Sequence, residues 1–310
     1  MSTLIARLST AAAVAATAGT AASLAAAPGA NAAENPAAFI GDRGIVVATD
    51  RNVNVREPGE GRTVVVRDGA RVAYAAGERV VYEQDGKILT RDLEDTVRLQ
   101  PGRGVDRQKL LGLGQVGRST IAVIEEERVP EDRGDAGAYR SQLITFNVNT
   151  GERTVLRRGV STFEGGYSNA HVLDDGSVVA SSYQSVAIFV ERYAADGTPT
   201  WRKRVASDAV AELAVIGDRV NVVRTRSRGG DTFLRIVRLD PTTGERRNAR
   251  GVRVPGAPAA PFCQDWRSPQ RLLCRTNAGP VVIDTIGGDA GAVNRIKAPR
   301  GAFASVIGGR

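Results

Sequence analysis

One strand pattern recurs six times along the chain, and it limits the possible folds more than any other feature. Runs of β-branched and alternating apolar residues, separated by 35, 41, 57, 42 and 52 residues, begin near Ile45, Val80, Ile121, Val178, Val220 and Leu272. Such runs predict strands, because β-branched side chains pack well on a pleated surface. A repeat of about 40 to 50 residues indicates modules that each supply one small sheet.

Each module is expected to contain four strands. The first is rich in small residues and ends at a tight turn, as in 37–43, 72–77, 171–176 and 211–219. The β-branched run is the second. The third ends in a polar turn with glycine, as in 147–152, 194–198 and 239–245, where glycine can take the positive φ that the turn needs. A basic fourth strand ends the module.

Six modules predict an all-β chain that folds as a six-bladed β-propeller of four-stranded antiparallel blades. Residues 302–310 repeat the first-strand pattern of 211–219 with no module after them. We therefore expect the C-terminal strand to complete the first blade, either displacing or flanking residues 37–40. A seven-bladed propeller and an array of β-sandwiches are the alternatives that this pattern leaves open.

One repeat also resembles a known group of propellers. Residues 193–201, with the sequence Tyr-Ala-Ala-Asp-Gly-Thr-Pro-Thr-Trp, look like part of the repeat of pyrroloquinoline-quinone-type and WD40-like propellers. The resemblance implies a propeller over roughly residues 37–310. It implies no particular activity or cofactor, because propellers carry many unrelated functions.

The N-terminus has the pattern of a secretory signal peptide. Arg7 precedes an Ala-rich apolar stretch over 8–27, and small residues follow up to Ala33. This order of charged, apolar and cleavable segments predicts that 1–33 are removed on export. Residues 34–310 then form one propeller domain with no transmembrane segment, either secreted or held at the cell envelope of a bacterium.

Two cysteines, Cys263 and Cys274, are the only ones in the sequence. Export exposes them to oxidising conditions, so we expect them to pair across two strands, in a register that also sets Trp266 opposite Arg271. Closing this short loop should stabilise the fold by roughly 3 kcal/mol. The pair lacks the further ligands of a zinc site, and we predict neither a metal nor a cofactor.

The candidate ligand-binding residues lie on first strands, which line the channel of a propeller. Tyr167, Asn169 and His171 belong to one such strand, and Asp265 and Trp266 are the other candidates. His171 is the only histidine, and no G-x-S-x-G motif or free cysteine accompanies it, so no catalytic residue is assigned.

Three other sequence motifs are interpreted as structural rather than functional. The glycines of 112–117 match G-x-G-x-x-G, but a predicted strand follows where phosphate binding needs a helix, so they indicate a blade turn. The acidic stretch 125–135 lacks the spacing of a calcium loop and is expected to be solvated. Basic clusters at 202–204, 224–228 and 246–253 are expected on fourth strands or edge turns.

Charge is distributed unevenly, with a net −2 over residues 33–140 and +9 over 141–310. Such asymmetry suits contact with anionic polymers. Few aromatic residues interleave with the basic clusters, which argues against specific binding of nucleic acid. The leading hypothesis is a monomeric, non-catalytic propeller that binds an envelope polymer or a partner protein. The alternative is a propeller-type hydrolase or lyase with His171 as acid or base.

Overall fold

The computed structural model describes the greater part of the chain, and every element in that part is a strand. The described residues are 44–56, 62–76, 79–91, 96–128, 140–161, 165–206, 211–216, 219–228, 231–254, 262–268, 271–276, 279–285, 290–299 and 302–306. No helix able to cross a membrane occurs within these ranges.

The strands form six antiparallel sheets of four, here called blades A to F. Blade A has β1 (Ile45–Ala48), β2 (Val53–Arg56), β3 (Arg62–Val66) and β24 (Phe303–Val306). Blade B has β4 (Val72–Ala76), β5 (Arg79–Gln84), β6 (Lys87–Arg91) and β7 (Thr96–Arg98). Blade C has β8 (Arg107–Val116), β9 (Ser119–Arg128), β10 (Arg140–Asn147) and β11 (Arg153–Ser161).

The other three blades have the same strand order. Blade D has β12 (Gly165–Val172), β13 (Val178–Gln184), β14 (Ala187–Tyr193) and β15 (Pro199–Ala206). Blade E has β16 (Ala211–Ile216), β17 (Arg219–Arg228), β18 (Asp231–Leu239) and β19 (Arg246–Val254). Blade F has β20 (Phe262–Ser268), β21 (Arg271–Thr276), β22 (Gly279–Asp284) and β23 (Val293–Arg295).

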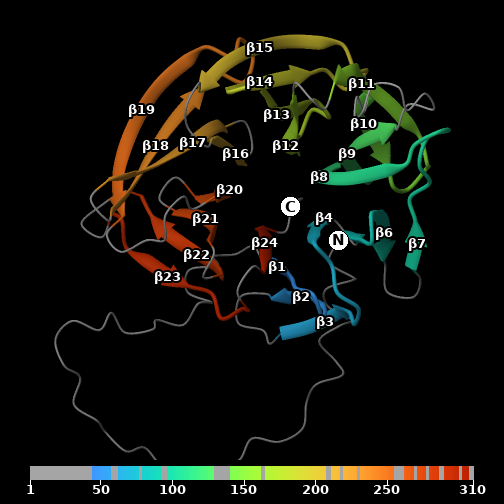
Figure 1. Cartoon of the computed structure of the whole chain (residues 1–310), viewed down its shortest axis with the longest axis horizontal. Coiled ribbons are helices and arrows are strands. Elements are labelled where there is room, and N and C mark those ends of the chain that lie inside the picture. Colours follow the sequence, from blue (N-terminus) through green and yellow to red (C-terminus); the bar gives the residue numbers. More distant parts are fainter. Residues whose placement is uncertain are drawn as a thin grey trace, which may run out of the picture.

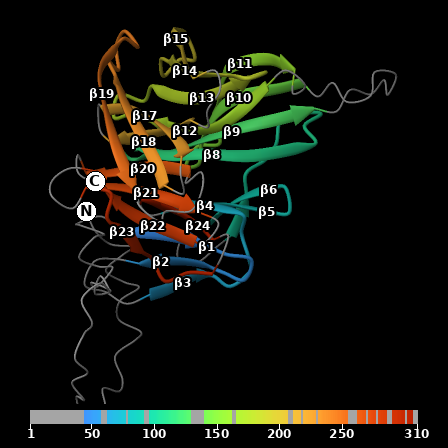
Figure 2. The ribbon, with the colours of Figure 1, turned by 60° about the vertical axis from the view of Figure 1, so that its left-hand side comes forward.

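The blades are arranged around a common centre (Figures 1 and 2). Strands β24, β4, β8, β12, β16 and β20 lie innermost, and each contacts the next, including β20 with β24. The chain is therefore a six-bladed β-propeller. The six predicted second strands correspond to β1, β5, β9, β13, β17 and β21, so the repeat read from the sequence is confirmed.

Blade A combines strands from opposite ends of the described chain. Strand β24 pairs with β1, with Val47 opposite Ala304 and Ala48 opposite Phe303. The Phe303 ring packs edge-to-face on Tyr74 of blade B at 5.3 Å, and Ser305 Oγ donates a hydrogen bond of 2.9 Å to Ala73 O. The C-terminal strand thus completes blade A as predicted. Residues 37–40 lie outside the described part.

The core lies in the layers between neighbouring blades, because the two faces of each sheet are turned toward different neighbours. Between blades E and F, Val223 and Leu234 pack with Leu272 and with the Cys263–Cys274 disulfide. The cysteines lie directly opposite each other, as predicted. Trp266 pairs with Leu272 rather than Arg271, because an irregularity between Cys263 and Asp265 shifts the register by one residue. A second irregularity follows Trp266 and sets Ser268 opposite Arg271.

The motif at 112–117 is mostly strand, which corrects part of the prediction. Residues up to Val116 belong to β8, and only Gly117, with a φ of 57°, lies in the hairpin turn. A side chain at Gly112 would lie 1.9 Å from Ala170 O of blade D, so glycine is needed here for close packing of two inner strands. No helix follows the glycines, which agrees with the rejection of a phosphate loop.

The expectation of a solvated acidic loop at 125–135 is wrong for its first residues. Glu125 and Glu126 extend strand β9 and are buried. Glu126 accepts hydrogen bonds from Gly102 N at 3.1 Å, Gln108 Nε2 at 3.1 Å and Gln142 Nε2 at 2.7 Å, and pairs with Arg153. These donors compensate for the burial of the Glu126 carboxylate. The acidic composition of 125–135 did not predict this burial. Residues 129–139 lie outside the described part.

Candidate binding cleft

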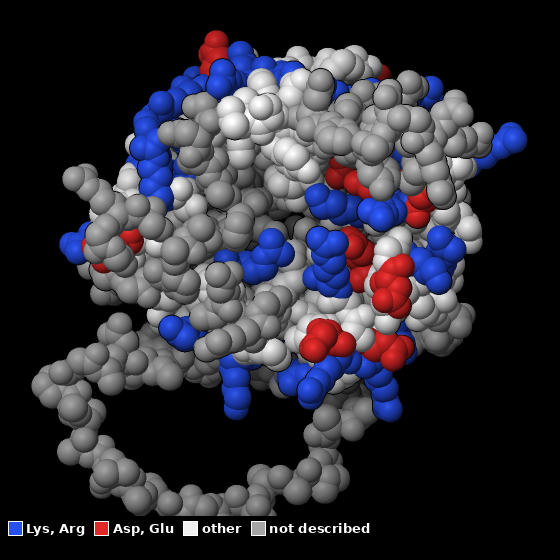
Figure 3. Space-filling model, viewed as in Figure 1, with Lys and Arg blue, Asp and Glu red and all other residues white. Residues whose placement is uncertain are grey.

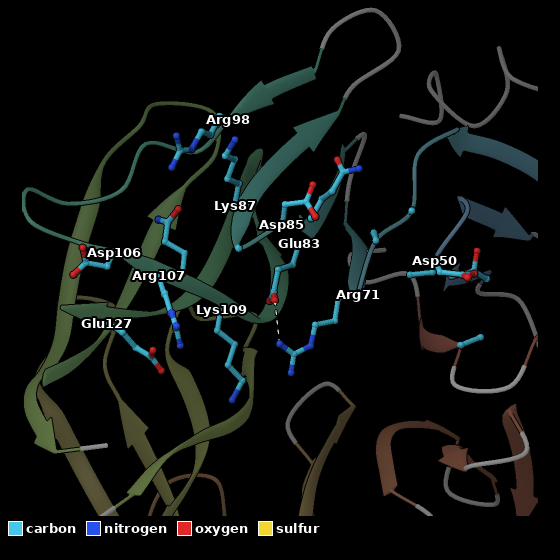
Figure 4. Close-up of a pocket in the computed structure, with 18 of the residues that line it drawn as sticks. Asp50, Arg71, Glu83, Asp85, Lys87, Arg98, Asp106, Arg107, Lys109 and Glu127 are labelled. Carbon is cyan, nitrogen blue, oxygen red and sulfur yellow. Dashed lines mark ion pairs between the residues drawn. The ribbon is translucent and has the colours of Figure 1, made fainter. Parts of the chain in front are cut away.

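An open cleft of about 1360 Å³ lies where the inner strands of blades A, B and C begin. Acidic and basic side chains lie next to each other over this part of the surface (Figure 3). The charged side chains that line the cleft are Asp50, Arg71, Glu83, Asp85, Lys87, Arg98, Asp106, Arg107, Lys109 and Glu127 (Figure 4).

The tight turn between β5 and β6 positions part of the cleft lining. Asp85 and Gly86 join β5 to β6 in a two-residue hairpin, with φ angles of 49° and 70°. Asp-Gly is a favoured pair for such turns, because both residues tolerate positive φ. The turn sets Asp85 and Lys87 at the rim of the cleft, both exposed. Arg71 and Lys109 enter it from the starts of β4 and β8.

Glu83 is a buried carboxylate that joins blades B and C at the cleft. Its Oε2 atom accepts a 3.1 Å hydrogen bond from Leu110 N, and its Oε1 atom lies 3.6 Å from Arg71 Nη1. The Arg71 side chain remains 78% exposed, pointing into the same region as Lys109 (Figure 4). Glu83 therefore has a structural role, and Arg71 can still meet a ligand.

Lys109 joins blade C to blade D. Its Nζ atom donates a hydrogen bond to Tyr167 O and lies 3.7 Å from Glu125 Oε2, while Tyr167 N donates to Glu125 Oε1 at 3.3 Å. Burial raises the pKa of Glu125 above its usual range, although the nearby Lys109 ammonium acts in the opposite direction. The cleft wall is thus fixed by an ion pair within blade C and by hydrogen bonds from both of its members to the Tyr167 main chain of blade D.

Another buried carboxylate, Glu191 of blade D, joins blades C and D through its ion pair with Arg157. It accepts hydrogen bonds from Ser182 Oγ at 2.6 Å, Arg157 Nη1 at 2.6 and 2.7 Å, and Arg202 Nε at 3.0 Å, and also from Tyr193 Oη. Burial alone would raise the pKa of Glu191, but these hydrogen bonds outweigh it and lower the pKa. We name this group of five residues the Glu191 cluster.

Tyr167 is the predicted site residue closest to the cleft, but only its main chain contacts Lys109. The side chain is fully buried, and burial, followed by the nearby Tyr193 and Glu191, raises its pKa. Asn169 is buried as well, and His171 is partly exposed further along β12. His171 follows Tyr167 by four residues on β12, which corresponds to roughly 13 Å along the strand.

The structure therefore does not bring the side chains of Tyr167, Asn169 and His171 together at the cleft, and a ligand site at these residues stays a prediction. Asp265 and Trp266 lie on β20, and their side chains are outside the described part. Sequence reasoning missed the cleft residues Arg71, Lys87 and Lys109, because no motif contains them. One available signal was the Asp85-Gly86 pair, which predicts the hairpin that shapes the rim.

The fold and the cleft define a six-bladed β-propeller with a mixed-charge cleft beside its centre. No protein-family model matches the sequence, and no curated protein matches it. The structure is similar to an oligogalacturonate lyase solved in complex with manganese, with a TM-score of 0.52 and 16% identity over 80% of this chain and 70% of that chain. At this identity the likeness shows the fold alone.

Two further solved structures are more distant. TolB from Acinetobacter baumannii has a TM-score of 0.48 and 14% identity, covering 85% of this chain and 67% of that one. A polysaccharide lyase of family PL25, an ulvan lyase bound to -[GlcA(1-4)Rha3S]-, has a TM-score of 0.47 and 11% identity, covering 83% of this chain and 70% of that one.

Proposed function

We propose that the chain is an exported, non-catalytic binding protein, and that its cleft holds a segment of a partner protein. The observation that carries this proposal is the lining of the cleft, where basic and acidic side chains occur in equal numbers. A surface that carries both positive and negative side chains complements a protein segment that also carries both. A simple polyanion would be repelled by the acidic side chains of the cleft.

The size of the cleft supports a macromolecular ligand. Pockets for small molecules are mostly apolar and of about 300–1,000 Å³. This cleft is larger, at about 1360 Å³, and its lining is dominated by charged groups. Its most buried carboxylate, Glu83, already accepts a main-chain hydrogen bond, so it supports the wall rather than serving as a free acid or base.

Export is part of the proposal and has two supports. The pattern of residues 1–33 is typical of a secretory signal, and the Cys263–Cys274 disulfide suits an oxidising compartment. We propose that the mature protein acts outside the cytoplasm, at the envelope or beyond it.

Site-specific photo-crosslinking in the producing cell tests this proposal. A photoreactive residue at Lys87, on the cleft rim, should give one discrete protein adduct, and the same residue at Arg204, on the outer strand β15, should not. Arg71→Glu combined with Arg107→Glu should reduce the adduct by about tenfold, because like-charge contacts cost several kcal/mol.

Two results would contradict the proposal. One is an adduct of equal yield from Lys87 and Arg204, or none from Lys87. The other is turnover by the purified protein in a panel of hydrolase and lyase substrates that His171→Ala abolishes, which would favour the enzymatic alternative. The double variant must keep the wild-type urea midpoint, so that lost crosslinking reports on binding.

A further inference from the structure

We propose that blade E carries a second ligand site, a hollow lined with arginines that binds an acidic polysaccharide. The hollow has a volume of about 550 Å³ and is formed by β17, β18 and β19. It lies on a different blade from the cleft, and this inference does not depend on the function proposed for the cleft. We call it the arginine hollow; the residues that define it are Arg224, Arg226, Phe233, Arg235, Gly251 and Arg253.

Strand register gathers these residues on one face of the sheet. Arg224 lies opposite Arg235, which lies opposite Gly251. In the next row, Arg226 lies opposite Phe233, which lies opposite Arg253. Directly opposed residues share a face, as do alternate residues along a strand. The expectation that residues 224–228 lie on a fourth strand or edge turn is wrong, because they belong to the second strand, β17.

The hollow begins where the packing of blade E against blade D ends. Val222 and Val237 are buried on the same face and belong to the apolar cluster shared with blade D. Beyond them Phe233 is 37% exposed, an unusual position for a large apolar ring. A Cβ atom at Gly251 would find nothing closer than Leu234 O at 4.0 Å, so the floor is open.

The charge of the hollow selects an anionic ligand. None of the described residues that line it is acidic. Asp231, at its border, pairs with Arg253 through Nε at 2.7 Å and Nη2 at 2.6 Å. Arg224 lies opposite Arg235 in the register, so two guanidinium groups share one row of the sheet. Carboxylate or sulfate groups bound beside such guanidinium groups would accept paired, charge-assisted hydrogen bonds.

A polysaccharide fits the hollow better than a nucleic acid does. Proteins that bind single-stranded nucleic acid stack successive bases on several aromatic rings, but Phe233 is the one aromatic residue in the described lining. Successive arginine rows are about 7 Å apart along the strands, which allows repeated contacts with a linear acidic chain. Basic side chains also continue along the outer edge formed by β19 and β15 (Figure 3).

Fluorescence anisotropy of the mature protein with labelled polymers tests the proposal. Alginate offers carboxylates, dextran sulfate offers sulfates, and neutral dextran and an oligothymidylate serve as comparisons. We expect at least one acidic polysaccharide to bind and neutral dextran not to. Arg226→Glu with Arg235→Glu should weaken binding by about tenfold or more, since the change removes charge-assisted hydrogen bonds and adds two negative charges that repel an acidic chain.

Matched variants separate the hollow from overall charge. Arg103→Glu with Arg118→Glu makes the same change in net charge on exposed turns elsewhere, and should weaken binding by less than about threefold. Gly251→Leu fills the floor without changing charge, and should also weaken binding. Urea midpoints equal to that of the wild type establish that each variant is folded.

Three outcomes would overturn the proposal. The wild type could bind neither acidic polysaccharide. The hollow and turn variants could lose binding equally, which would indicate general charge attraction. The oligothymidylate could bind more tightly than both polysaccharides through the same arginines, which would identify a nucleic-acid site. Comparison of alginate with dextran sulfate shows which anionic group the arginines prefer.

Discussion

Deletion of residues 302–310 is expected to abolish cooperative folding of the mature chain. The deletion removes β24, whose residues Phe303, Ala304 and Ser305 are buried, and uncovers β1, which is buried along its whole length. Loss of the Phe303 side chain alone should cost roughly 3–5 kcal/mol. That is a large share of the roughly 5–15 kcal/mol by which a typical domain is stable. An uncovered β1 edge also invites aggregation.

Urea unfolding and light scattering measure this effect, and a peptide provides the control. A synthetic peptide of residues 299–310, added in trans, should pair with β1 and restore a single unfolding transition, as in other cases of strand addition. Phe303→Leu retains the strand and should cost less than about 1.5 kcal/mol. A truncated chain that unfolds at the wild-type urea concentration would show that β24 contributes little.

Glu191→Leu is expected to be the most destabilising single substitution among the buried charged groups of the C–D interface. It would leave Arg157 and Arg202 without their shared carboxylate and remove the acceptor of Ser182 and Tyr193. Breaking a buried ion pair costs roughly 3–5 kcal/mol. Because Arg157 and Arg202 are 33% and 37% exposed and can regain water, we expect about 3 kcal/mol.

Urea unfolding at two pH values checks both the size and the electrostatic origin of this effect. The pKa of Glu191 is lower in the folded protein than in the unfolded chain, so its stabilisation is complete above the unfolded pKa. It is lost as pH falls through the folded pKa. The gap between wild type and Glu191→Gln should therefore be larger at pH 7 than below about pH 4.

A surface ion pair supplies the matched comparison. Asp175 pairs with Arg192 at 2.6 Å, but the Asp175 side chain is 58% exposed. Asp175→Asn should change the free energy of unfolding by less than about 1 kcal/mol. Equal effects of the Glu191 and Asp175 substitutions would contradict the role given to the Glu191 cluster.

The repeat could be predicted from sequence because its signals are local. The β-branched runs at Val178 and Val220 and the glycine turns between third and fourth strands each depend on a few neighbouring residues. Pairing of Cys263 with Cys274 followed from short spacing. The register beyond the cysteines was not predictable, because the irregularities near Trp266 leave no clear pattern in the sequence.

The cleft and the buried carboxylates could not be predicted, because they depend on contacts between strands of one blade and between neighbouring blades. Glu125 and Glu126 look like the start of a solvated acidic loop until Lys109 and Arg153 arrive from other strands. Arg71 and Lys87 meet Lys109 only when blades B and C lie side by side. His171 was a candidate because it is the only histidine, but sequence alone could not show that the cleft is lined by residues of blades A, B and C and not by His171.

Cysteine pairing between β1 and β24 tests the ring arrangement most directly. Val47 lies opposite Ala304, so Val47→Cys with Ala304→Cys should oxidise to a disulfide that peptide mass mapping detects beside the native Cys263–Cys274 bond. Val47→Cys with Ser305→Cys places the thiols on opposite faces and should stay reduced. A link in the second variant, or none in the first, would contradict the pairing of the two ends of the chain in blade A.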